Sequence, residues 1–294
     1  MESGTEQLIT QLKALADPVR LRIVALCAQG ECSVSELTWV LGHSQPRVSQ
    51  HLKQLCTASI LERFRDGHFV YYRVATRGDD AALRRRLLSL VPDDDAAFGQ
   101  DSDKLRALRG VRTESATETP SHDRPLHRAL VALTVAAPLG DLVDIGCGQG
   151  RVLKLLASRA RRAVGVDIDS DARRFARAEL LLAGLPNCSL RQGDMYALPF
   201  ADSDFDTAIL DDVLPDAARP TEAIAEAVRI LRPGGRLLML SSVAAQDLDD
   251  LQTRLAGWCA ATGLRLAPAR AIPAKEPQWL LAVATKHDAA TAAA

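Results

Sequence analysis

The stretch LVDIGCGQG, residues 142–150, decides the fold of the second half of this 294-residue chain. Its apolar run Leu142–Ile145 predicts a short buried strand, and a helical pattern at Arg151–Arg159 follows the glycine-rich loop. Glycine suits such a loop, because a backbone without side chains turns tightly and approaches a ligand closely. The next apolar strand, Ala163–Val166, begins an alternation of strands and helices. That alternation is typical of a parallel sheet covered by helices on both faces.

An acid follows the second of these strands. Asp167 lies 21 positions after Gly146, where a carboxylate accepts hydrogen bonds from the hydroxyls of a ligand's ribose. The loop has the form G-x-G-x-G and not the G-x-G-x-x-G that is common in nicotinamide and flavin enzymes, and Asp144 comes before it. The pattern continues with GDM at 193–195, an expected strand at 207–210 and LRPGGRL at 231–237.

Together these segments resemble class I S-adenosylmethionine-dependent methyltransferases over residues 126–285. The resemblance implies an α/β Rossmann-like fold that binds S-adenosylmethionine (SAM) or S-adenosylhomocysteine (SAH), with no metal. The resemblance implies that the amino-acid end of the cofactor contacts Asp144, Gly146, Cys147, Gly148 and Gly150. It implies that Asp167 binds the ribose and that Ile168, Asp194 and Met195 contact the adenine. Asp211 would border the methyl group.

The sequence does not assign a catalytic residue. Methyl transfer from a sulfonium proceeds by in-line displacement, which positioning and desolvation accelerate without a nucleophilic side chain. After the strand at 207–210 the chain continues DDVLPDAARP, without the N/D-P-P-Y/F of methylases that act on adenine or glutamine nitrogens. Asp211, Asp212 or Asp216 could serve as a base toward a small hydroxyl or amine, and the alternative is that they are solvated surface acids.

The first half of the chain predicts a winged helix–turn–helix of α(+β) type. Apolar periodicity and capping residues predict helices at 7–15, 19–28, 33–41 and 45–56. Gly42-His43 supplies the tight turn between the last two. A hairpin with strands at 61–65 and 69–74 follows, and Asp66-Gly67 suits its turn.

This half also carries a basic segment. Residues 44–77 hold six Lys and Arg against two Asp and Glu, which fits a phosphate backbone, although a solvated surface is the alternative. The helix 45–56 is expected to bury Val48, Leu52 and Leu55 and to expose its polar side chains to DNA. The candidate DNA-binding residues are Ser44, Gln45, Arg47, Ser49, Gln50, Lys53, Arg65, His68 and Tyr72.

LADPVRLRIVALC (15–27), SVSELTWVLGHSQPRVSQHLKQL (33–55) and ERFRDGHFVYYRV (62–74) are similar to the ArsR/SmtB family of bacterial repressors. The resemblance covers residues 8–91. It implies operator DNA as a partner and a homodimer formed by the first and last helices, Gln7–Leu15 and Ala81–Val91. Ser33 and Ser35 stand where arsenic-sensing members carry cysteines, and hydroxyls bind soft metals poorly, so no metal is expected.

Composition and segment patterns set the organisation of the chain. We expect a DNA-binding and dimerisation domain at 1–92, a Ser/Thr/Pro-rich linker at 93–125 that includes a short helix at 103–111, the methyltransferase-like domain at 126–285 and a tail at 286–294. Six cysteines without a C-x-x-C pair argue against a zinc ribbon and against a disulfide framework. Charges interrupt every long apolar run, which predicts a cytoplasmic protein without a signal peptide or a membrane span.

The combination resembles fused ArsR-type regulators linked to the methionine cycle. The first hypothesis is a transcriptional regulator, a repressor, whose methyltransferase-like domain binds SAM or SAH and thereby changes operator binding. A second is an active small-molecule methyltransferase whose winged helix regulates its own operon. A third is a methyltransferase that uses the winged helix only to dimerise.

Overall fold

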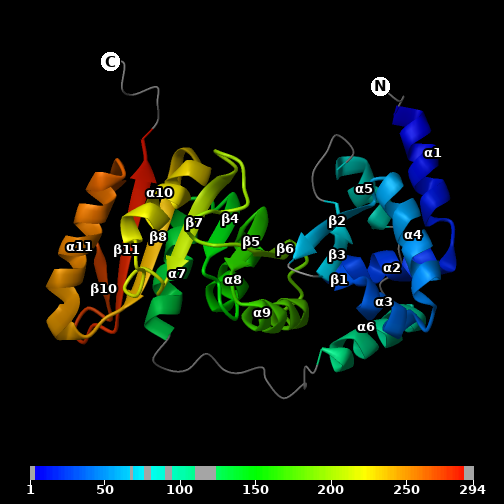
Figure 1. The fold of residues 1–294 in the computed structure, drawn as a ribbon, viewed down its shortest axis with the longest axis horizontal. Coiled ribbons are helices and arrows are strands. Elements are labelled where there is room, and N and C mark those ends of the chain that lie inside the picture. The colour runs from blue at the N-terminus through cyan, green and yellow to red at the C-terminus, as the bar shows by residue number, and fades with distance from the viewer. Residues whose placement is uncertain (1–3, 67–68, 76–80, 90–94, 110–123, 288–294) are drawn as a thin grey trace. The chain divides into compact units, whose positions relative to one another are not determined.

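The computed structural model describes residues 4–66, 69–75, 81–89, 95–109 and 124–287 (Figure 1). The chain divides into two compact units. One comprises Met1–Ser115 with Arg177–Pro186, and the other comprises Ala116–Ala176 with Asn187–Ala294. The domain boundaries expected from the sequence remain predictions.

The first unit combines helices with a small antiparallel sheet. Its elements are α1 (Gly4–Leu15), α2 (Pro18–Gln29), β1 (Cys32–Ser33), α3 (Val34–Leu41), α4 (Gln45–Thr57), β2 (Leu61–Asp66), β3 (Phe69–Val74), α5 (Ala81–Leu88) and α6 (Ala96–Leu108). The three strands have the order β1-β3-β2. The pair α3 and α4 followed by the β2–β3 hairpin confirms the predicted winged helix–turn–helix.

Local capping residues explain where these helices begin and end. The Asp17 carboxylate caps α2 by accepting a hydrogen bond from the amide of Arg20 at 3.0 Å. Gly42 ends α3 with a φ of 67°, a left-handed conformation that glycine adopts without strain, and it forms the turn into α4. Helix α4 then buries Val48 and Leu55 in the core of the unit.

Helix α6 begins before the predicted helix at 103–111 and continues the packed structure into the expected linker. The Asp95 carboxylate caps its first turn. The buried Asp101 accepts hydrogen bonds from Arg22 of α2 at 2.6 and 2.7 Å, and Leu105 is buried completely. An ion pair with α2, which is far from α6 in the sequence, thus stabilises the position of α6. Apolar periodicity in the sequence does not predict such an ion pair.

The second unit is an α/β structure around one sheet. Its elements are α7 (Arg124–Ala136), β4 (Asp141–Ile145), α8 (Arg151–Leu156), β5 (Arg162–Asp167), the first half of α9 (Ser170–Leu182), β6 (Cys188–Gln192), β7 (Phe205–Asp211), α10 (Pro220–Ile230), β8 (Leu231–Ser242), α11 (Leu248–Ala261), β9 (Leu264–Leu266), β10 (Arg270–Ile272) and β11 (Trp279–Lys286). From Arg177 onward α9 belongs to the first unit. The sheet order is β10-β11-β8-β7-β4-β5-β6, and β9 pairs with β11.

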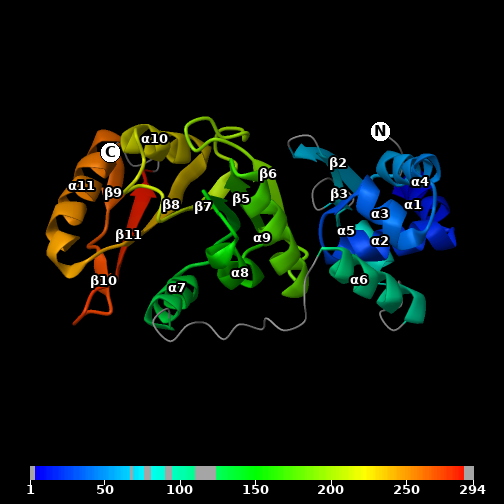
Figure 2. The same cartoon turned by 60° about the horizontal axis from the view of Figure 1, so that its bottom comes forward.

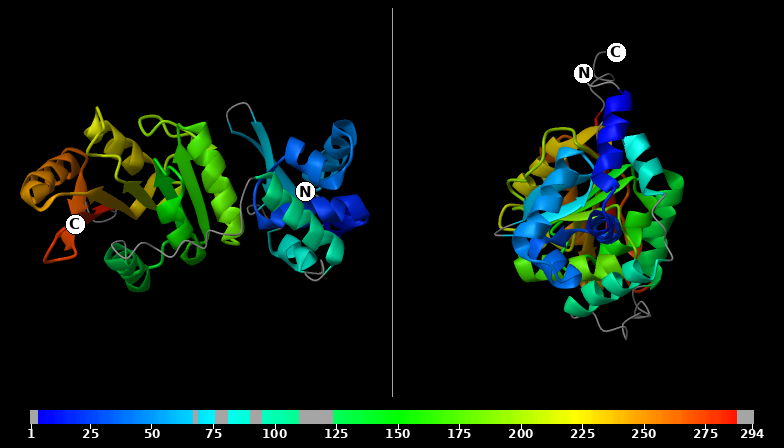
Figure 3. Two further views of the ribbon diagram at one scale, coloured as in Figure 1. Left: turned by 90° about the horizontal axis from the view of Figure 1, so that it is seen from below. Right: turned by 90° about the vertical axis from the view of Figure 1, so that its right-hand side faces the viewer.

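The central strands of this sheet are parallel, as the sequence predicts. Strands β6, β5, β4, β7 and β8 run parallel, and β11 joins β8 in the antiparallel direction, so the sheet is mixed. Helix α10 lies on one face, with α7 and α8 on the other (Figures 2 and 3). Val143 and Ile145 of β4 pack in one core with Ile224 of α10 and Leu255 of α11. This architecture confirms the Rossmann-like class.

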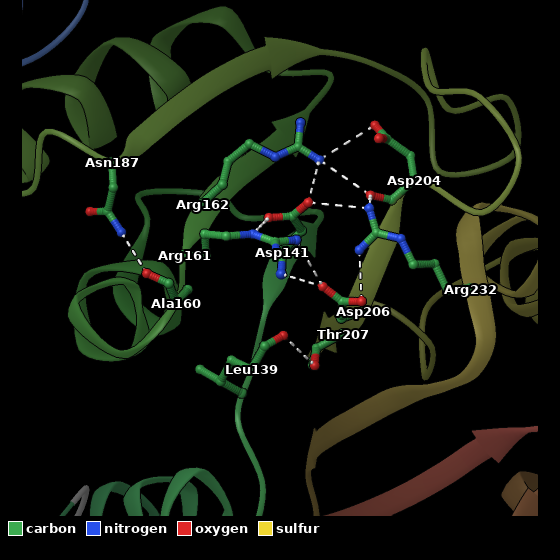
Figure 4. A network of polar contacts seen from close by, with 10 residues as sticks. All are labelled: Leu139, Asp141, Ala160, Arg161, Arg162, Asn187, Asp204, Asp206, Thr207 and Arg232. Carbon is green, nitrogen blue, oxygen red and sulfur yellow. Dashed lines mark hydrogen bonds and ion pairs between the residues drawn. The ribbon is translucent and has the colours of Figure 1, made fainter. Parts of the chain in front are cut away.

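Ion pairs link residues at the amino ends of the parallel strands β4, β5 and β7 (Figure 4). Asp141, at the start of β4, is only 5 % exposed. Its carboxylate accepts hydrogen bonds from Arg161 at 2.8 Å and from Arg232 at 3.2 Å. Asp206 pairs with Arg232 at 2.6 Å and accepts the amide of Asp141 at 2.7 Å. Burial would raise the pKa of Asp141, but the surrounding guanidiniums hold it below its ordinary value.

Candidate functional site

The residues predicted to bind a cofactor lie at the opposite edge of the same sheet. Asp144 is near the end of β4, Asp167 ends β5 and Asp211 ends β7. These three strands are parallel neighbours, with Asp144 beside Gly165 of β5 in the register. Their carboxyl ends therefore meet at one edge, which is where ligands bind in open parallel sheets.

Asp144 is a buried acid without a partner. Its side chain belongs to a residue that is 1 % exposed, and within the part of the chain that the structure describes neither carboxylate oxygen has a hydrogen bond. Burial, reinforced by the charge of Asp211, raises the pKa of Asp144 well above its ordinary value despite the opposing charge of Arg151. A buried carboxylate without a partner is costly. A cationic group of a ligand would relieve that cost.

The loop after Asp144 depends on its glycines and on Asp167. Gly146 has a φ of 73°, and a Cβ there would lie 2.5 Å from a methyl group of Val213. The Asp167 carboxylate accepts the amide of Gly148 at 2.7 Å and the amide of Asp169 at 2.8 Å. Asp167 thus holds the loop, and a carboxylate has further lone pairs for ribose hydroxyls.

An apolar side chain stands exposed beside Asp167. Ile168 is 70 % exposed and directly follows the buried strand β5. Asp194 is exposed and accepts the amide of Tyr196 at 3.0 Å, while Met195 is half-buried against the core. An aromatic ring placed over Ile168 would cover this apolar surface. Cys147 is buried, and burial raises the pKa of its thiol, so the thiol stays protonated. Its contact with a cofactor remains a prediction.

Two of the three acids at the end of β7, Asp211 and Asp212, are already engaged. Arg151 of α8 donates to both oxygens of Asp211, at 3.0 and 3.1 Å, and its guanidinium lies 4.8 Å from the ring centroid of Trp279. Asp212 has a φ of 58°, and its carboxylate accepts both the amide and the hydroxyl of Ser242, at 2.7 and 2.8 Å. The third acid, Asp216, is exposed.

Two of these side chains were missed by the sequence reasoning. Arg151 follows the glycine-rich loop directly, but nothing in the sequence indicates that it would meet Asp211. Trp279 begins β11 near the end of the chain, and only the sheet order brings it to this edge.

The predicted DNA-binding face of α4 is exposed. Five exposed candidates lie on α4, namely Gln45, Arg47, Ser49, Gln50 and Lys53, and Ser44, which is also exposed, directly precedes the helix. Ser44 occupies the position before the helix, but its hydroxyl makes no capping bond. On the hairpin, Arg65 is exposed, whereas Tyr72 is 9 % exposed and packs in the core. His68 lies outside the described residues.

Ser33 and Ser35, which stand where arsenic-sensing members of the ArsR/SmtB family carry cysteines, have a structural role in this chain. Ser33 caps α3, and its hydroxyl lies 3.1 Å from that of Ser35. Cys32 is buried in the core. Among the residues that the structure describes, no group of three or more His, Cys, Asp or Glu side chains could hold a metal ion.

Comparison with known proteins agrees with both halves. Residues 17–62 match the family model "Bacterial regulatory protein, arsR family", and residues 143–239 match "Methyltransferase domain". The chain is 51 % identical over 63 residues to an arsenic resistance transcriptional regulator of Pseudomonas putida, covering 21 % of this chain and 49 % of that protein. It is 38 % identical over 155 residues to a ubiquinone/menaquinone biosynthesis C-methyltransferase of Dinoroseobacter shibae, covering 48 % and 61 %.

A third relative comes from a transposon. An uncharacterized 37.1 kDa protein of transposon TN4556 from Streptomyces fradiae is 32 % identical over 169 residues, covering 53 % of this chain and 48 % of that protein. The chain thus spans about half to three fifths of the length of these curated relatives.

The fold and these matches define a DNA-binding domain joined to a class I methyltransferase domain. The chain is a fusion of an ArsR-type winged helix–turn–helix with a SAM-dependent methyltransferase fold. The first domain implies DNA binding, and the second implies binding of SAM or SAH. No helix of the described residues is long and apolar enough to cross a membrane.

Proposed function

We propose that this protein is a homodimeric transcriptional repressor whose methyltransferase-like domain binds SAM or SAH and thereby changes its affinity for operator DNA. Such regulation requires the ligand to bind the DNA-competent and DNA-incompetent dimers with unequal affinity. The pocket then acts as the sensor and α4 as the reader.

The observation that carries the proposal is the contrast between Asp144 and the acids after β7. Asp144 is buried and has no hydrogen-bond partner within the described residues, so a cationic ligand group would be favoured there. Asp211 is paired with Arg151 and Asp212 with Ser242, so neither is poised to take a proton from an acceptor. The pocket thus offers a contact for the ligand, while neither of these two acids is free to serve as a base toward an acceptor.

Each predicted pocket residue other than Asp211 has a role in this proposal. The ammonium group of the ligand binds Asp144, the glycine loop from Gly146 to Gly150 approaches its amino-acid end, and Asp167 accepts from the ribose. Ile168 and Met195 sandwich the adenine, whose amine donates to Asp194. Bound SAM would supply a methyl group activated by its sulfonium.

DNA binding is assigned to the exposed face of α4 and to Arg65 of the hairpin. Long polar side chains on one helix face suit base edges and phosphates in a major groove. The dimer is assigned to α1 and α5, because Ile9 and Leu12 of α1 are exposed apolar residues that a second copy would cover.

The test is a titration of operator binding. The purified protein is bound to its own upstream DNA at fixed salt, with SAM and SAH added separately and Asp167→Ala as the matched pocket variant. A shift in operator affinity with either ligand, lost in Asp167→Ala, is expected. Specific DNA binding that ignores both ligands would refute the sensor.

The second candidate is an active small-molecule methyltransferase that represses its own operon. Its support is the 38 % identity to a named C-methyltransferase. In that case, incubation with methyl-labelled SAM and a panel of small acceptors yields a labelled product. The Arg151→Ala variant, which releases Asp211, tests whether this acid takes part, because turnover that depends on Asp211 would rise.

A further inference from the structure

Helix α9 belongs to both compact units. Its residues up to Ala176 lie in the second unit, and those from Arg177 onward lie in the first unit. The helix is continuous across this boundary, because Ser170–Leu182 form one α-helix without a break. A single element therefore begins at the predicted cofactor edge and ends within the DNA-binding unit.

The start of α9 is bonded to Asp167. The Asp167 carboxylate accepts the amide of Asp169 at 2.8 Å, and its backbone carbonyl accepts a hydrogen bond from Nη1 of the buried Arg173 at 2.9 Å. Ala176 lies against the glycine loop, because a Cβ on Gly150 would come 3.2 Å from the Cβ of Ala176. The groups that hold the first half of α9 are therefore the ones proposed to bind the ribose and the amino-acid end of the ligand.

Arg177, in the second half of α9, is a buried cation of the DNA-binding unit. Its side chain is 7 % exposed, and its Nε donates to Oε2 of Glu31 at 3.0 Å while its Nη2 donates to Oδ2 of Asp66 at 2.7 Å. Its guanidinium carbon lies 3.9 Å from the ring centroid of Tyr71. Burial would lower the pKa of Arg177, but the charges of Glu31 and Asp66 raise it, so the guanidinium stays charged. We call these three interactions the Arg177 contact.

The partners of Arg177 belong to the small sheet that carries the hairpin. Glu31 directly precedes β1, and Tyr71 lies on β3. Asp66 is the last residue of β2 and is paired with Phe69 at the start of β3, so it stands at the turn end of the hairpin. Its neighbour in β2 is the exposed Arg65, which is expected to contact DNA. The Arg177 contact therefore fixes the end of the hairpin that presents Arg65.

The last turn of α9 is packed in the DNA-binding unit as well. Leu181 is buried in one hydrophobic core with Cys32 and Leu37. A hydrogen-bonded helix moves largely as a unit, and a packed core leaves little free volume to absorb a shift. A displacement of the first turn of α9 therefore reaches Arg177 through the helix itself, with no loop in between.

We propose that Arg177 is the positioning residue through which ligand binding at Asp167 changes how the hairpin presents Arg65 to DNA, an inference that rests on the proposed function. In the DNA-competent state the Arg177 contact holds Asp66 and the end of the hairpin in place. A ligand that binds the Asp167 carboxylate shifts the start of α9, and the Arg177 contact carries this shift to Asp66.

The experiment uses the full-length protein and three variants. Arg177→Ala removes the contact, and Arg177→Lys keeps the charge but loses the planar fork that reaches both carboxylates. Arg174→Ala is the matched control, because this residue is 82 % exposed on the same helix and pairs with the exposed Asp171. Operator affinity is measured with and without saturating SAM or SAH, and calorimetry establishes the saturating concentration for each variant.

We expect the ratio of operator affinities with and without ligand, about 5- to 150-fold for typical coupled sites, to fall to about twofold or less in Arg177→Ala. Arg177→Lys is expected to give an intermediate ratio, and Arg174→Ala keeps the full ratio. A purely structural role of Arg177 would weaken operator binding equally with and without ligand and would leave the ratio unchanged.

Removing Arg177 leaves Glu31 and Asp66 buried without its guanidinium, which is costly, so Arg177→Lys decides if Arg177→Ala does not fold. A wild-type ratio in the deciding variant overturns the inference and leaves the proposed function standing. A wild-type protein whose operator affinity ignores both ligands refutes the proposed function itself, and the role of Arg177 with it. The two failures are distinguishable because the second is visible before any variant is made.

Discussion

Two buried acids near the amino and carboxyl ends of one strand have different electrostatic surroundings. Asp141 and Asp144 both lie on β4 and are both buried. Asp141 is surrounded by arginines (Figure 4), which lower its pKa. Asp144 has a raised pKa and no hydrogen-bond partner within the described residues. Burial alone therefore does not identify a site. A buried acid that the protein leaves unsatisfied marks the edge where a ligand completes the structure.

The largest expected change in stability is at Asp141, whose carboxylate is paired with arginines. Asp141→Ala leaves Arg161 and Arg232 without their shared carboxylate and should lower the free energy of unfolding by about 3 kcal/mol. Urea denaturation measures this loss, with the exposed Asp171→Ala as control. An unfolding free energy within about 0.5 kcal/mol of wild type would contradict the structural role of this edge.

Asp144→Asn should have the opposite profile. It replaces a buried ionisable group, which has no hydrogen-bond partner within the described residues, with a neutral amide, so the free energy of unfolding of the unliganded protein stays equal or rises. Binding of SAM or SAH should weaken by about tenfold or more, because a charge-assisted hydrogen bond contributes about 1.5–3 kcal/mol. Calorimetry of ligand binding and thermal unfolding on the same samples test both signs. Unchanged ligand affinity would remove Asp144 from the pocket.

The pH dependence of stability sharpens the comparison. The lowered pKa of Asp141 means that its stabilisation is complete above the unfolded pKa, about 3.9, and is lost as pH falls through the folded value. The raised pKa of Asp144 means that the folded state binds its proton more tightly. Its ionisation therefore destabilises the fold as pH rises above about 3.9 until the folded pKa is passed.

The measurement is denaturation across this pH range. The stability advantage of Asp144→Asn over wild type should grow as pH rises, whereas the deficit of Asp141→Asn should shrink in acid. If the unfolding free energies of both variants depended on pH in the same way, the two acids would not have the different surroundings described above.

The smallest expected effect is at Ile168. This side chain is already exposed without ligand, so Ile168→Ala should change the free energy of unfolding by no more than about 0.5 kcal/mol. Ile168→Ala removes three carbons, and the adenine would cover the equivalent of fewer than two of them, so SAM or SAH binding should weaken by about tenfold at most, at about 0.8 kcal/mol per buried methylene. A loss of stability with unchanged ligand affinity would assign Ile168 to the core.

Local signals made much of this fold predictable. The Asp17 cap, the Gly42 turn and the glycine loop with Asp167 each act within a few residues, so their patterns are visible in the sequence. The structure confirms the two fold classes that followed from them. The DNA-binding and cofactor roles of the individual side chains remain predictions.

Contacts between distant segments were not predictable in this way. The pairing of Arg22 with Asp101 extends the packed structure into the expected linker, and the pairing of Arg151 with Asp211 engages a candidate base. Tyr72 belongs to a strand with alternating apolar residues, and only the packing of the sheet decides that its ring faces the core. Such contacts depend on topology and not on local propensity.

The division of α4 into two faces has an evolutionary consequence. Val48, Leu52 and Leu55 hold the helix in place, while Gln45 and Gln50 on the other face are exposed. Substitutions at exposed positions of this kind usually change stability little. Under the proposed function, duplicated copies of this gene can therefore drift toward new operators through the outer face of α4 while the inner face preserves the scaffold.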